Sequence, residues 1–420
     1  MVTALAGWLS AAAYAQFAFE AFELEHPAIQ YRFTPPADAV AALNAEIAAG
    51  RRELAFEGPS GYLRALLAAL DVPVESQMVV YSTTSLQGQR IRPGNPRAIY
   101  FNDSVAVAWV RGGFIEVASQ DPRQGGIFYL LPQNQVPTPQ LLRDDRCLTC
   151  HYALVAQGVP GFFVRSVPTA TDGVPMPWLG NAIPDHRTPL EERWAGWYVT
   201  GNAGSMAHLG NMLLTDRRAQ ELPARAKGVV TTLDGRFPTG DYLSPHSDIV
   251  ALLVFNHQAR MMNLVTRIGW ESRALAHDGK TADASLRDLA AEVVDYMLFV
   301  GEAPLHDVRG SSSFAATFQA RGPRDAAGRS LRDLDLERRL MRYPCSYMIY
   351  APAFDALPAD AKDAIYRRLW QVLSGEDRSA TYATLTQADR RAIVEILRDT
   401  KKDLPSYFIP LQSRPRAPAA

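Results

Sequence analysis

Cysteine is scarce in this sequence, which holds only three cysteines in 420 residues. That number excludes the disulfide-rich class of small secreted proteins. No run of about 18 apolar residues occurs, so we expect no membrane-spanning helix. The formal net charge of -1 gives no electrostatic reason to expect nucleic acid or an anionic membrane as a partner. Hydrophobic residues at 47% and charged residues at 21% are typical of a soluble globular fold.

Two of the three cysteines stand in one short motif, Cys147-Leu148-Thr149-Cys150-His151. It has the C-x-x-C-H pattern of c-type haem attachment, in which two thiols bind one porphyrin and the adjacent imidazole reaches the iron. The alternatives are a buried thiol pair, a thioredoxin-like redox pair and half of a zinc site. Zinc would need a second ligand pair at matching spacing, and the remaining cysteine, Cys345, is distant. The sequence therefore predicts one covalently bound haem c per chain, with His151 as the proximal ligand.

The ligand on the other side of the iron separates electron transfer from catalysis. A Met or His there fills the iron, whereas a vacant position permits ligand binding or peroxide chemistry. Met206 and His208 lie in a glycine-rich loop, residues 201–211, whose backbone can approach a porphyrin closely. The rival is His257, which shares a helix face with Met261 at the i, i+4 spacing. We expect the loop to supply the donor, while packing and hydrogen bonding are the alternative roles of these residues.

Further residues are candidates for contacts with the porphyrin. Arg143, Arg165 and Arg193 could bind the haem propionates, because the guanidinium fork matches a carboxylate. Trp194 and Trp197 could stack against the porphyrin edge or anchor the core instead. Each arginine could equally be an ordinary surface residue.

The hydrophobic pattern predicts an α+β fold with an antiparallel β meander near the N-terminus. Two helices come first, over residues 40–47 and 63–70. Short segments rich in β-branched and aromatic residues then follow, separated by turn signals. We expect strands at residues 77–84, 98–101, 105–110, 114–118 and 126–131.

The second half of the chain has a different character. Residues 141–211 are rich in proline, glycine and aromatics and show little periodicity, which fits a loop-rich segment around a large flat ligand. Beyond residue 215 helical periodicity dominates, and Thr386 and Asp389 have the spacing of a capping box. The sequence therefore predicts a mainly α-helical C-terminal half, with helices starting near Asp248, Ser285, Asp360 and Thr386.

The N-terminal residues are apolar and end in Ala13-Tyr14-Ala15, a small-x-small cleavage pattern, although a basic leader region is absent. We interpret residues 1–15 as an export signal, with a buried N-terminal helix as the alternative. Haem attachment outside the cytoplasm agrees with that interpretation, so we expect a periplasmic or otherwise extracytoplasmic protein. The expected organisation is a 16–140 N-terminal α+β region, a 141–215 haem-binding segment, a 216–410 helical domain and a 411–420 disordered tail.

The segments around the motif resemble a family of uncharacterised bacterial exported proteins with a single cytochrome c haem-binding motif. The resemblance spans about residues 77–408 and implies haem and export, but no known substrate. The chain is far larger than a small electron-shuttle cytochrome and has no second C-x-x-C-H motif, unlike the di-haem peroxidases. The similar segments are Gln157 to Gly161, Asp185 to Trp194, Gly196 to Gly201 and Tyr343 to Tyr347.

Three functions follow from these observations. The first is an exported monohaem c-type cytochrome-like protein that transfers electrons, with a redox partner protein or a small-molecule electron donor or acceptor. The second is a haem enzyme, peroxidase-like or oxygenase-like, with its substrate pocket in the helical domain. The third is a haem-based sensor or binding module. The oligomeric state stays open.

Overall fold

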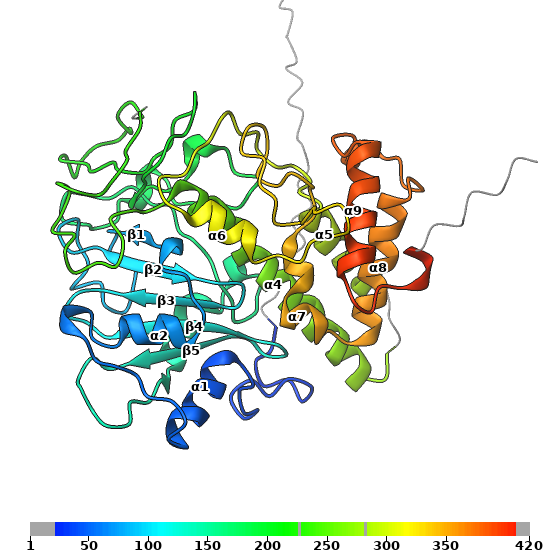
Figure 1. Cartoon of the computed structure of the whole chain (residues 1–420), viewed down its shortest axis with the longest axis horizontal. Coiled ribbons are helices and arrows are strands. Elements are labelled where there is room, and N and C mark those ends of the chain that lie inside the picture. The colour runs from blue at the N-terminus through cyan, green and yellow to red at the C-terminus, as the bar shows by residue number, and fades with distance from the viewer. Residues whose placement is uncertain (1–21, 226–227, 281–283, 409–420) are drawn as a thin grey trace, which may run out of the picture.

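The computed structural model describes residues 22–225, 228–280 and 284–408. Within these residues, an antiparallel sheet is built mainly from the N-terminal half and the long helices from the C-terminal half. This arrangement confirms the predicted α+β class (Figure 1). The expected export signal and the expected disordered tail both lie outside the described residues.

The predicted meander forms the body of the sheet. Its five strands follow one another along the chain, and each pairs antiparallel with the next. They are β1 Met78–Val80, β2 Arg97–Phe101, β3 Val105–Trp109, β4 Ile115–Asp121 and β5 Gly125–Leu131.

Two further short strands extend this sheet at its two edges. β6, Leu142–Arg143, pairs with β5, and β7, Trp197–Tyr198, pairs with β1. The spatial order is β6-β5-β4-β3-β2-β1-β7. Both added strands belong to the loop-rich segment, so this segment is attached to the sheet at both edges.

Two helices cover one face of the sheet, α1 Ala39–Ala48 and α2 Leu63–Ala69. Asp38 caps α1 by accepting from the amides of residues 40 and 41, and its second oxygen accepts from the hydroxyl of Tyr129 on β5 at 2.6 Å. The apolar side chains of α1 and α2 join those of the strands in one core cluster. This face is therefore closed, and the opposite face holds the site described below.

The C-terminal half is helical, as predicted. The longest helix, α4 Ile249–His277, begins at its N-cap Asp248 and is buried on nearly all sides. Thr386 and Asp389 form the predicted capping box at the start of α9, Gln387–Thr400. α5, α8 and α9 stand together beside the sheet (Figure 1). The other helices are α5 Ala284–Met297, α6 Phe314–Ala320, α7 Pro352–Asp355 and α8 Ala359–Leu373.

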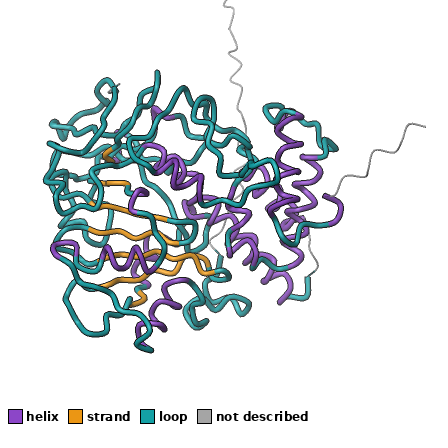
Figure 2. Tube along the Cα trace, viewed as in Figure 1, coloured by secondary structure: helices purple, strands orange, loops and turns teal. Residues whose placement is uncertain are grey.

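Loops occupy most of residues 141–211, as the sequence predicts (Figure 2). One core cluster joins side chains of β1 and β2, of this loop segment and of α4 and α5, so the three regions pack on one another. The domain boundaries named above stay predictions. Among the described residues, none of the helices combines the length and the apolar character needed to cross a membrane.

Candidate functional site

The C-x-x-C-H motif spans the end of a 3-10 turn, Asp145–Cys147, and the short helix that follows it. Asp144 starts this turn, because its carboxylate accepts from the amide of Arg146. Helix α3, Leu148–His151, follows at once and ends at the histidine. Cys147 is half-buried, Cys150 is exposed, and both thiols are free. The two thiols are therefore not consumed by a disulfide with each other.

The ring of His151 is held in one orientation. It lies between the rings of Phe128 and Phe163, with centroids 4.8 and 4.9 Å away. Its Nδ1 is 2.9 Å from the carbonyl oxygen of Gly161. A carbonyl oxygen can only accept, so Nδ1 carries the hydrogen and the lone pair of the neutral ring lies on Nε2. That tautomer, fixed by a backbone carbonyl, suits a histidine that binds a metal through Nε2.

Burial and nearby charges favour the uncharged forms of His151 and Cys147. Burial lowers the pKa of His151, which favours the uncharged ring with its lone pair. Burial, with the carboxylates of Asp144 and Glu116, raises the pKa of the Cys147 thiol to about 12. Cys147 is therefore a protonated thiol in the free protein.

The sheet face beside His151 is only partly covered. Residues paired directly across neighbouring strands share a face, so the registers place Phe128, Ala118 and Ala106 in one row. The next row holds Leu130 and Glu116, with Leu142 at the edge. Ala106 and Ala118 pack against the core cluster that includes α4, whereas Leu130 is half-buried and Leu142 is 56% exposed. We call the less covered part of this surface, Glu116, Leu130 and Leu142, the open face.

An ion pair crosses the open face. Arg97 on β2 and Glu116 on β4 lie on the same sheet face on either side of β3, and they meet diagonally across it at 2.8 Å between Nη1 and Oε2. Each side chain is 17% exposed. The charges of both residues act on the pKa of His151, with Arg97 lowering it and Glu116 raising it. The sequence did not predict this pair. The signal that could have found it is one charged residue within each of two predicted strands, at a position that faces the same side of the sheet.

These residues fit a covalently bound haem. The thiols are free, the imidazole presents an Nε2 lone pair, and apolar side chains beside it are partly exposed. Exposed apolar side chains also follow the motif directly, at Leu154 and Val155, which are 61% and 43% exposed. Cys147 and Cys150 would hold the porphyrin, and His151 would bind the iron.

The loop expected to supply the far-side ligand folds back on itself. His208 is buried, and its Nδ1 accepts from the amide of Gly210 at 3.0 Å, so the hydrogen of its neutral ring lies on Nε2. This tautomer is the reverse of the one in His151 and offers no free lone pair. Met206 is buried in the core cluster that also holds Trp194. Among the described residues, no hydrogen bond or ring contact joins His151 to either candidate.

His257 uses both of its ring nitrogens inside the helical core. Nδ1 lies 2.8 Å from Nδ1 of His186, and Nε2 lies 2.7 Å from the hydroxyl oxygen of Ser346. The ring also stacks on Tyr296 and Phe299. This arrangement argues against His257 as an iron ligand, because neither nitrogen keeps a free lone pair.

The candidate propionate ligands are engaged in different ways. Arg193 is buried and donates to the carbonyls of Thr188 and His186, and burial lowers its pKa to about 10. Arg143 donates to the Tyr31 carbonyl and pairs with Asp145. These two arginines therefore spend donors on the protein itself.

Arg165 is half-buried and donates from Nε to the side chain of Asn181 at 2.8 Å. Trp197 donates from its ring nitrogen to the backbone carbonyl of Arg165, and Trp194 donates to Asn256 on α4. The ring of Trp194 contacts the ring of His208 edge-on at 5.7 Å. Both tryptophans are buried in the core, which supports the anchoring role that the sequence left open.

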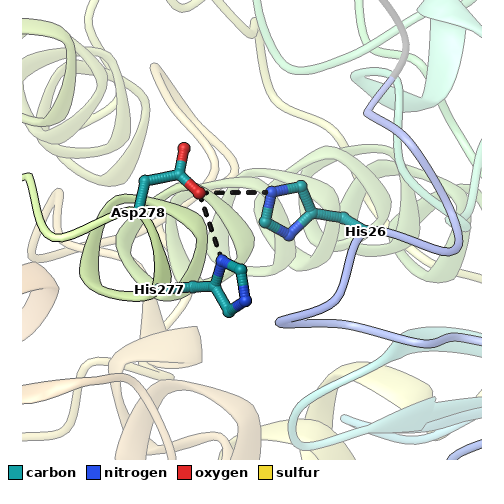
Figure 3. A group of neighbouring side chains, drawn as sticks. All are labelled: His26, His277 and Asp278. Carbon is teal, nitrogen blue, oxygen red and sulfur yellow. Dashed lines mark hydrogen bonds and ion pairs between the residues drawn. The ribbon is translucent and has the colours of Figure 1, made fainter.

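A second group of potential ligands lies at the end of α4, where His26, His277 and Asp278 meet (Figure 3). The Asp278 carboxylate is 3.2 Å from Nδ1 of His277 and 4.0 Å from Nε2 of His26. Nδ1 of His26 accepts from the amide of Ala28, so its Nε2 carries the hydrogen that points to Asp278. Lys280 also pairs with this carboxylate. We therefore interpret the group as a polar clamp that ties the N-terminal segment to α4.

A cavity of about 640 Å³ lies between α8 and α9, and the side chains that line it, within residues 370 to 398, include none of the C-x-x-C-H motif. No family model, no curated protein and no solved structure matches this chain. The functional argument therefore depends on the residues and the geometry described above.

Proposed function

We propose that this chain is an exported monohaem c-type cytochrome that transfers electrons. The observation that carries the proposal is the tautomer of His151: the Gly161 carbonyl fixes its Nδ1–H and leaves the Nε2 lone pair beside two free thiols. When bound, a c-type haem supplies one-electron chemistry at its iron.

The chain's own residues would then orient and shield the group. Phe128 and Phe163 limit rotation of the imidazole, and the apolar side chains of the open face give the porphyrin a partly dry surface. A redox partner protein or a small-molecule donor or acceptor would reach the edge that stays exposed. The exposed Leu142 and Leu154 are in segments that flank the motif, and they support this assignment.

The first experiment measures covalent haem. The chain is produced in a host with c-type haem maturation, and haem staining is measured after denaturing electrophoresis. We expect one haem per chain, and none in the Cys147→Ala, Cys150→Ala double variant. Cys345→Ala is the matched control, because Cys345 is buried away from the motif and should leave staining unchanged. Haem that acid-acetone extracts from the wild type, or bound zinc in its place, would contradict the proposal.

A specific observation favours a second candidate, a haem enzyme or ligand-binding protein. His257 and His208 both lack a free lone pair as folded, which favours an iron with an open sixth position. The ferric spectrum separates the two functions. A low-spin spectrum that Met206→Ala converts to high spin supports electron transfer, whereas a high-spin wild type that binds cyanide quickly supports the enzyme.

A further inference from the structure

The ion pair on the open face has an unused donor. Arg97 spends Nη1 on Glu116, but its Nε is buried and has no hydrogen-bond partner among the described residues. Leaving a buried charged donor without a partner costs free energy, so such a group can take an acceptor from outside the protein. Among the described residues of the C-terminal half, Arg339 and Arg368 have the same unpartnered Nε, and it is the position of Arg97 on the sheet face beside the motif that singles it out. The other side of the pair is complete, because Glu116 also accepts from the hydroxyl of Ser85 at 2.8 Å.

The position of the pair connects it to the motif. Glu116 lies directly across from Leu130 in the strand register, one row from the Phe128 that contacts His151. Arg97 projects on the same sheet face as Glu116 and reaches it diagonally across β3. Its guanidinium fork matches a carboxylate, and a porphyrin carries its carboxylates on its edge.

We propose that Arg97 binds a haem propionate on the open face and that the Arg97–Glu116 pair sets the reduction potential of the iron. This inference depends on the proposed haem function. A positive charge near the iron favours the reduced state and a negative charge favours the oxidised state, because reduction removes one positive charge from the iron. Loss of Arg97 therefore lowers the potential, and loss of Glu116 raises it.

The experiment compares the reduction potentials of Arg97→Leu, Arg97→Lys and Glu116→Gln holoproteins by redox titration. At a fixed ambient potential, we expect the ratio of reduced to oxidised protein to fall on the order of tenfold in Arg97→Leu and to rise by a similar factor in Glu116→Gln. Arg97→Lys keeps the charge and should stay close to the wild type. Circular dichroism and unfolding curves identify variants that fold.

The matched control is another half-buried ion pair far along the chain, Arg339 and Asp389, with 2.7 Å between Nη2 and Oδ1. Arg339→Leu should leave the potential unchanged. Folded variants that carry covalent haem but show no opposite shifts would overturn this inference and leave the proposed function intact. A wild type without covalent haem would overturn both.

Discussion

A single backbone carbonyl decides which ring nitrogen of His151 keeps its lone pair. The Gly161 oxygen takes the Nδ1 hydrogen, and the amide of Gly161 donates back to the His151 carbonyl at 2.9 Å. His208 shows the opposite case, because there a backbone amide takes the Nδ1 lone pair. The neighbouring backbone groups thus give His151 and His208 opposite tautomers.

The three thiols of the haem-free chain should differ in reactivity. Cys150 is exposed, while Cys147 has its pKa raised to about 12 by burial and by Asp144. At pH 8 the thiolate fraction of Cys147 is then roughly a thousandfold below that of an unperturbed thiol. Iodoacetamide labelling followed by mass spectrometry should modify Cys150 first. Cys345 is buried, and burial raises its pKa to about 12, so it should react only after unfolding. Equal labelling rates at all three thiols would contradict this order.

The sequence identified the motif but not its surroundings. Cys147, Cys150 and His151 are adjacent in the chain, so their spacing alone predicts their chemistry. Arg97 and Gly161 act through contacts set by strand register and loop path, and no local pattern reports either. Arg193 was predicted as a propionate ligand from its residue type, although its donors serve two carbonyls of the core.

At the scale of elements, one residue of α4 fixes the loop behind the motif. The Asn263 side chain accepts from the amide of Phe162 at 2.8 Å and donates to its carbonyl at 2.7 Å. A Cβ at Gly161 would lie 2.2 Å from Oδ1 of Asn263, so only glycine fits beside this clamp. α4 thereby holds the carbonyl that orients His151.

Asn263→Ala should loosen both the fold and the site. It leaves the amide and the carbonyl of Phe162 buried without partners, which costs about 2 to 6 kcal/mol at roughly 1 to 3 kcal/mol each. Urea unfolding measures this loss, and hydrogen exchange should show that the Nδ1–H of His151 loses protection. Ser272→Ala, also buried on α4, is the control and should cost far less. An unchanged exchange rate in Asn263→Ala would show that the clamp does not position the ring.

Long elements could be predicted from the sequence, and very short ones could not. The structure has a strand at each of the five predicted meander positions and the predicted long helices. The first strand is shorter than predicted, because β1 covers only Met78–Val80 of the expected 77–84. β6 and β7 have two residues each, too few for any period, so pairing with a neighbouring strand alone defines them. The sequence therefore could not predict that the loop segment pairs with both edges of the sheet.

For the whole molecule, buried histidines make stability depend on pH. Burial lowers the pKa of His186, His208 and His257, to about 4 in His208 and about 3 in His257. In the unfolded chain these groups titrate near 6.5. Below that pH the unfolded state binds protons that the folded state does not, so stability is complete above pH 6.5 and falls as the pH drops toward 4.

Each of these histidines should remove about 1.4 kcal/mol per pH unit from the free energy of unfolding in that window. Urea unfolding at pH 7, 6 and 5 measures the slope. In His257→Gln the slope should shrink by the contribution of one histidine, about 1.4 kcal/mol per pH unit, whatever the variant loses in absolute stability. His306→Gln, at an exposed histidine, should keep the wild-type slope. If His257→Gln also keeps it, His257 is not the titrating group.

The clamp between Phe162 and Asn263 can form only late during synthesis of the chain. The two residues are 101 positions apart, and synthesis runs from the N-terminus at about 5 to 20 residues per second. The motif and the meander strands therefore exist for roughly 5 to 20 seconds before the helix that locks the loop has been made. During that interval the clamp does not yet hold the loop beside the two thiols, so Cys147 is more accessible before α4 has been made than after it.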